Sequence, residues 1–251
     1  MLTTASRHFD QDMARACALR QHAHTIAADP LGSDVRRAAW MMAVAAADAY
    51  FCDAYADVIS RSLRAKGLEP SVPIPDRLAR LKVPVVAVIR PASGGWRWRM
   101  AARELIEEES VLSLEKVRQL FGHFFRDGHK IVNQDTIATW LTHPSARVRC
   151  FGITATEYRA MTLHQQAGAR KGALEQFETR FEAIFQRRHD CIHNCDRPKV
   201  ALQPISDGQA SKAIEDVGFL VNRVNDELLS QFPVYLEGLG FSVATRNQVL
   251  Q

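Results

Sequence analysis

Residues 174–195 read LEQFETRFEAIFQRRHDCIHNC. Bulky apolar residues recur every three or four positions in the first half, which is the spacing of one buried helix face: Leu174, Phe177, Phe181, Ile184 and Phe185. Continued along the chain, this face carries Arg188 and then Ile192. A buried arginine needs an acidic partner, an interface or a substrate, because an unpaired buried charge is strongly destabilising. The segment therefore predicts a long packed helix that ends in a charged functional motif.

The composition indicates a soluble globular protein, either one large domain over residues 1–251 or one domain with an appendage. The chain is 47% hydrophobic and 24% charged, with both signs mixed, so a packed core is expected and disorder is not. The net charge of +4 permits a polyanionic partner without requiring one. The five cysteines form no CxxC pair, and there is no signal peptide and no apolar run long enough for a bilayer. We therefore predict a cytoplasmic protein without membrane contact.

Outside the opening stretch, helical patterns dominate and strand signals are almost absent, which predicts an all-α bundle. The expected helices cover 4–28, 33–67, 76–82, 96–109, 114–125, 133–141, 154–166 and 207–232. The 33–67 segment is rich in alanine, so we expect it to lie centrally, packed against the 174–195 helix. Ser33 and Asp207 are expected as N-caps, and Gly168 and Gly172 are expected to loosen the chain. Residues 68–153 read as an insertion of short accessory helices and irregular chain, in which 85–89 could be a strand or a helical turn and 144–151 is irregular. Residues 233–251 form a tail without a clear pattern.

The motif and its helical frame resemble the HEPN superfamily of compact helical domains, in particular a stand-alone bacterial branch. The family motif is an arginine, a polar residue, a few variable positions and a histidine on a late helix. Arg188, His189 and His193 match it, and Cys191 and Ile192 occupy two positions that are hydrophobic in that branch. Many members are endoribonucleases that need no metal or other cofactor and have a composite site at a homodimer interface.

The resemblance implies roles for these residues. His193 would act as general acid or base on the ribose 2′-hydroxyl and the leaving 5′-oxygen, and Arg188 would hold the scissile phosphate. Supporting positions are His189, Asp190, Asn194 and Asp48, the last because it matches an acidic position that the family often keeps. The implied partners are RNA, a second copy of the chain and, in a toxin–antitoxin or phage-defence setting, an antitoxin or defence-system protein.

Helix geometry independently favours a dimer. Arg188 and His193 lie roughly 140° apart on an ideal helix, so both cannot face one phosphate from a single straight helix. Two copies that meet across a two-fold axis would bring two arginines and two histidines into one cleft.

The same stretch also spells H-x-C-x-H-x-C over residues 189–195, which raises the possibility of zinc. The pairs 189/193 and 191/195 lie roughly 200° apart on a helix. One tetrahedral site cannot use all four side chains without breaking the helix, so we expect no metal here and expect Cys191 in the core.

Other candidates have simpler explanations. Asp53 could pair with Arg188, as Asp48 could, but each alone is more typical of an ordinary exposed acid, and Asp48 is the better candidate of the two. Trp96-Arg97-Trp98-Arg99 could stack bases, although paired tryptophans more often anchor packing. His123, Asp127 and His129 resemble solvated loop residues. Two further functions remain open: a non-catalytic HEPN module that binds nucleotide, RNA or protein, and a helical interaction protein whose motif is accidental.

Overall fold

The computed structural model describes residues 1–26, 30–80, 98–100, 102–103, 106, 110–125, 130–197 and 201–251. Over these residues the chain forms ten helices with defined bounds and no strand, which confirms the all-α prediction. None of the described helices is both long and apolar enough to cross a bilayer.

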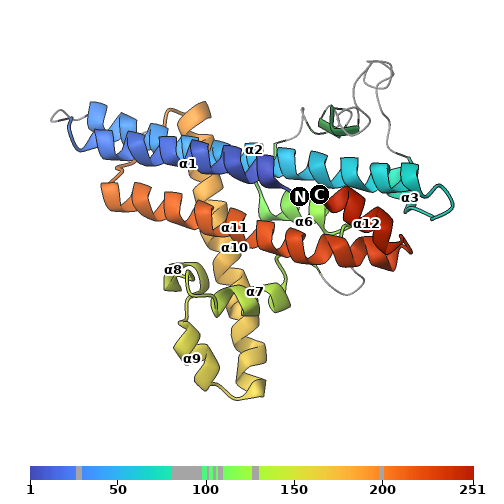
Figure 1. The fold of residues 1–251 in the computed structure, drawn as a ribbon. Coiled ribbons are helices and arrows are strands. Elements are labelled where there is room, and N and C mark those ends of the chain that lie inside the picture. Colours follow the sequence, from blue (N-terminus) through green and yellow to red (C-terminus); the bar gives the residue numbers. More distant parts are fainter. Residues whose placement is uncertain are drawn as a thin grey trace.

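Four helices form an elongated layer that makes up most of the molecule (Figure 1): α1 (Thr3–Ala23), α2 (Leu31–Leu68), α11 (Asp207–Gly238) and α12 (Val243–Leu250). The alanines of α2 permit close helix approach, and Ala39 and Ala43 pack with Ala16 of α1 in a fully buried cluster. The chain ends meet within this layer, where the Met1 amino group donates to the Leu250 carbonyl oxygen at 3.2 Å.

Helix α10 (Leu163–His193) crosses this layer steeply, and short helices surround its first half (Figure 1). They are α7 (Gln134–Leu141), α8 (Val148–Phe151) and α9 (Ala155–Ala160). The predicted apolar face of α10 is buried here, with Phe177 stacked on Phe151 at a centroid distance of 5.4 Å. Helix α6 (Leu114–Phe121) packs between α2 and α10, and α3 (Asp76–Ala79) follows α2. The expected contact between α10 and α2 is present, since Trp40 Nε1 donates to the Ile184 carbonyl oxygen at 3.1 Å.

A buried carboxylate also anchors α10. Asp216 of α11 is fully buried and pairs with Arg149 of α8 and Arg180 of α10, each at 2.8 Å. Because a buried charge is tolerated only when it is paired, these two bonds hold three helices together.

Several predicted boundaries are wrong. The expected 154–166 helix is split, because Thr162 forms a capping box with Gln165 and starts α10 at Leu163. Gly168 and Gly172 lie within α10 without interrupting it. Helix α2 begins at Leu31, before Ser33, and Ser206 rather than Asp207 caps α11.

The C-terminal tail is helical, since α11 continues through Pro233 to Gly238 and α12 follows. Residues 148–151, expected to be irregular, form α8, while α6 ends at Phe121, before the expected residue 125. The 85–89 segment and most of the expected 96–109 helix lie outside the described residues.

Candidate active site at the end of helix α10

The motif, residues 187–194, occupies the last turns of α10, where the buried face of the helix changes. Ile192, expected in the core, is 47% exposed, whereas Asp190 is buried. Asp190 lies about 180° from Phe181 on an ideal helix. The first half of α10 buries the Phe181 side against α6, α7 and α8, and its end buries the opposite side against the chain that returns toward α11. The prediction for Ile192 is wrong because it extended one buried face along the whole helix, although the elements that pack against the helix change near its end.

The two motif histidines lie together on the exposed surface. The rings of His189 and His193 have centroids 4.3 Å apart with an interplanar angle of 41°. Both side chains are exposed, since neither position faces the layer. Four residues separate them, which places them one turn apart on the same helix face. The structure therefore places the His193 ring next to the His189 ring rather than next to the Arg188 side chain.

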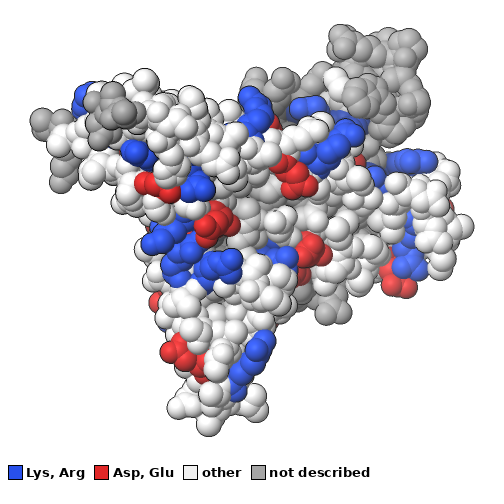
Figure 2. All heavy atoms as spheres, turned by 60° about the vertical axis from the view of Figure 1, so that its left-hand side comes forward, with Lys and Arg blue, Asp and Glu red and all other residues white. Residues whose placement is uncertain are grey.

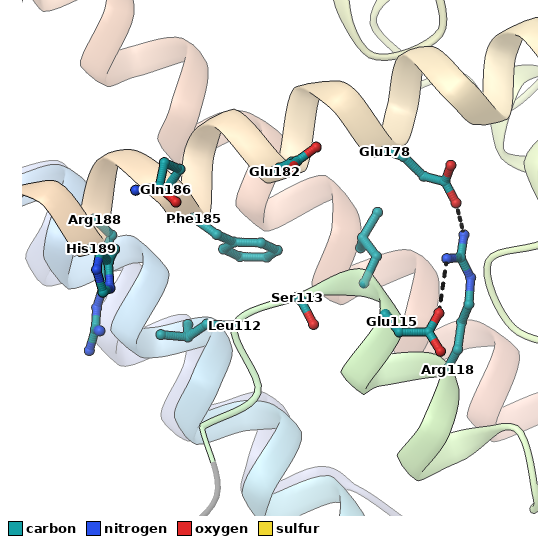
Figure 3. A pocket seen from close by; sticks show the side chains of 11 residues that line it. Leu112, Ser113, Glu115, Arg118, Glu178, Glu182, Phe185, Gln186, Arg188 and His189 are labelled. Carbon is teal, nitrogen blue, oxygen red and sulfur yellow. Dashed lines mark hydrogen bonds and ion pairs between the residues drawn. The ribbon is translucent and has the colours of Figure 1, made fainter. Parts of the chain in front are cut away.

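Arg188 lines a groove, and His189 lies at the same end of it (Figure 3). The Arg188 Nε is buried and makes no hydrogen bond with any described residue. Figure 3 shows Arg188 and His189 extending from α10 toward Leu112, on the side of the helix that carries Phe185. The N–H at the Arg188 Nε is therefore still available to donate a hydrogen bond inside this partly enclosed groove.

This groove, called the α6–α10 groove below, has a volume of about 560 Å³. One wall is α10 and the other is the start of α6 with the two residues before it (Figure 3). Its lining combines apolar, acidic, basic and amide side chains: Leu112, Ser113, Leu114, Glu115, Arg118, Glu178, Glu182, Phe185, Gln186, Arg188 and His189.

The two acids of α2 that the sequence suggested as partners of Arg188, Asp48 and Asp53, do not contact it. Asp48 Oδ1 instead accepts a hydrogen bond from the Val111 backbone N–H at 2.6 Å, which fixes the chain just before the groove wall. Asp53 lies near His8 and Arg103, at 3.4 and 3.5 Å. The pairing that the sequence suggested for either acid is therefore absent among the described residues.

Asp190 and Asn194 shape the end of the helix. The Asp190 carboxylate accepts from Gln186 Nε2 at 3.0 Å. Its backbone carbonyl oxygen accepts from the backbone N–H groups of Asn194 and Asp196, both at 2.9 Å. Asn194 is the exposed C-cap. These residues terminate the helix directly after His193 and so define the position of that histidine.

A buried ion cluster behind the motif was missed by sequence reasoning. Asp196 is fully buried, and its Oδ2 accepts from Arg37 Nε at 2.6 Å and from Arg187 Nη2 at 2.9 Å. The Arg187 guanidinium also lies over the Trp40 ring, 5.3 Å from its centroid. No local spacing connects Arg37 to Asp196, so the only available signal was a charged residue on the alanine face of α2.

The H-x-C-x-H-x-C stretch remains one continuous helix up to His193. Burial, followed by the nearby Asp196 carboxylate, raises the pKa of Cys191 to about 11, so its thiol stays protonated near neutral pH. Cys191 is half-buried rather than in the core. Among the described parts of the chain, no three His, Cys, Asp or Glu side chains gather in a way that could hold a metal ion.

The remaining candidates are only partly described. Arg99 pairs with Asp57 at 3.1 Å, so its charge is used within the fold. His123 lines a small cavity with Tyr55 and Tyr235, and residues 96, 97, 127 and 129 lie outside the described residues.

The charges are mixed on the face of the molecule shown in Figure 2. Figure 2 shows basic and acidic side chains next to one another over the face in view, without one uninterrupted basic surface. Comparison with family models, with curated proteins and with solved structures finds no match for the chain.

Proposed function

We propose that the protein is a metal-independent endoribonuclease of the HEPN type, with Arg188 and His193 as its catalytic residues. The observation that carries the proposal is the end of α10: an exposed His193 next to His189, with Arg188 beside them and its buried Nε free of described partners. Imidazoles exchange protons near neutral pH, and a guanidinium matches the geometry of a phosphate.

The reaction follows from these groups. His193 removes the proton of the ribose 2′-hydroxyl, and the resulting oxygen attacks the adjacent phosphorus. The bond from phosphorus to the 5′-oxygen breaks, and an imidazolium protonates the leaving oxygen. Arg188 stabilises the negative charge on the phosphoryl oxygens. The products are a 2′,3′-cyclic phosphate and a 5′-hydroxyl, and DNA is not cleaved because it lacks the attacking group.

The imidazolium could come from a second copy of His193. On one helix, Arg188 and His193 face different sides. Around the helix axis, the direction of His189 lies between the directions of these two residues. A homodimer that joins two α10 ends would place an arginine from one copy opposite a histidine of the other. The exposed Ile192 at this helix end supplies apolar surface for such an interface.

The test is incubation of the purified protein with total RNA in EDTA. His193→Ala and Arg188→Ala should each lower the cleavage rate about a hundredfold or more, as expected for loss of a proton-transfer group or a transition-state contact. Arg188→Lys should restore it only in part, because the planar fork is lost.

Control positions are available at His164 on α10 and at Arg64 on α2. His164→Ala and Arg64→Ala replace exposed side chains that lie outside the motif and the α6–α10 groove, and both should retain full activity. Activity that disappears in EDTA and returns with a divalent ion would contradict the mechanism. RNA binding without cleavage would instead assign the chain as a binding module.

A further inference from the structure

The α6–α10 groove is electrostatically asymmetric along its length. At one end Arg118 pairs with Glu178 and lies 3.6 Å from Glu115, and its Nε donates to the Val132 carbonyl oxygen (Figure 3). Its charge is therefore neutralised within the fold. At the other end Arg188 and His189 have no described acidic partner. A phosphate is attracted to one end of the groove only.

The middle of the groove suits a flat, partly polar group. Phe185 extends from α10 into the space above Leu112, and both residues line the groove (Figure 3). Glu182 lies one turn before Phe185 on the same wall, and its carboxylate makes no ion pair or hydrogen bond with any described residue. A ligand that reaches from Arg188 toward Glu182 would need an anion at one end, an apolar face in the middle and hydrogen-bond donors at the other end.

We propose that this groove binds the single nucleotide next to the scissile phosphate and selects a base that carries an amino group. The inference rests on the proposed function, because the anion at Arg188 is taken to be the RNA phosphate. Cytosine and adenine carry an exocyclic amino group whose N–H donors a carboxylate accepts well, whereas uracil has a carbonyl acceptor where cytosine has its amino group. Three carboxylates, Glu115, Glu178 and Glu182, face the single Arg118 charge at this end, and the remaining negative charge repels a further phosphate, so the groove takes one nucleotide rather than a continued strand.

The test measures binding without cleavage. Two dinucleotides made of 2′-deoxy nucleotides, one with two cytosines and one with two uracils, lack the attacking hydroxyl and carry one internal phosphate. Titration of each into the full-length protein in EDTA, followed by calorimetry or NMR shifts, gives both dissociation constants. The cytosine ligand should bind about tenfold more tightly.

Glu182→Gln should reduce this preference to within about twofold, because an amide can donate to the uracil carbonyl as well as accept. The matched control is Glu175→Gln on the same helix, where an exposed glutamate lies 3.9 Å from Lys171 and outside the groove. This control should keep the tenfold preference. Circular dichroism of both variants checks that the helical fold is unchanged.

Equal affinity of the wild type for the two ligands, absence of binding at millimolar concentration, or equal preferences in the two glutamate variants would overturn the inference. These outcomes are separable from failure of the proposed function, which is measured as cleavage of RNA. A chain that cleaves RNA but shows no cytosine preference refutes the groove inference alone. A chain that binds with the expected preference but never cleaves refutes the endonuclease proposal alone.

Discussion

Arg187 and Arg188 are adjacent in the chain, yet their side chains lie in different surroundings. Arg187 is held by Asp196 and lies over Trp40, whereas the Arg188 Nε has no described partner and the side chain lines the α6–α10 groove. The sequence pattern identified Arg188 as the candidate functional residue. The structural role of Arg187 could not be read from helix periodicity, because its partner Asp196 comes from the turn after the helix.

This difference predicts how the buried cluster responds to mutation. Asp196→Ala leaves Arg37 buried without its main counter-charge and should lower the free energy of unfolding by about 3 to 5 kcal/mol. Arg187→Ala removes the hydrogen bonds to Asp196 and to the Pro204 carbonyl oxygen while Arg37 still pairs with Asp196, and should cost about 2 kcal/mol. Arg188→Ala should change stability by less than about 1 kcal/mol, since it breaks no described bond. Urea unfolding followed by circular dichroism measures all three, and an equal loss for Arg187→Ala and Arg188→Ala would contradict the assignment.

At the scale of the element, apolar periodicity predicted α10 correctly over the Phe177 to Phe185 stretch and failed at both ends. At the start, the pattern missed that the capping box at Thr162 is strong enough to begin a helix that includes Gly168 and Gly172. At the other end, the burial of Asp190 in place of Ile192 reflects packing partners on the opposite side. Such partners belong to the tertiary structure, so a local pattern cannot contain them.

The two glycines in α10 give a test at this scale. Both are exposed, and a Cβ built at either one meets no atom within 4 Å. Gly168→Ala and Gly172→Ala should therefore each raise the free energy of unfolding by about 0.5 to 1 kcal/mol, because alanine loses less backbone entropy in a helix. Gly122→Ala is the contrasting variant, since its Cβ would lie 2.7 Å from the Arg118 carbonyl oxygen. Thermal melts should show higher midpoints for the first two variants and a lower one for the third.

At the scale of the whole molecule, the all-α class followed from the scarcity of strand signals, but the arrangement did not. The sequence placed α10 against α2, and that contact is present, but α2 packs most extensively with α1 and α11, and α10 crosses them (Figure 1). This crossing leaves the end of α10, with His189, Ile192 and His193, exposed at the surface. A catalytic group there needs a second surface to exclude water and complete the site, which is the physical case for a dimer.

Mixed dimers test whether that second surface is another copy of the chain. Sedimentation at micromolar protein should give a dimer, and Ile192→Glu should shift it toward the monomer while the helical content stays the same. If one histidine from each copy acts in a single cleft, a dimer of one wild-type and one His193→Ala chain loses one of two required proton-transfer groups. Its activity should then fall far below half that of the wild type. Activity of one half would show that each copy works alone, with His189 as the partner of His193 on the same helix, and the composite site would be wrong.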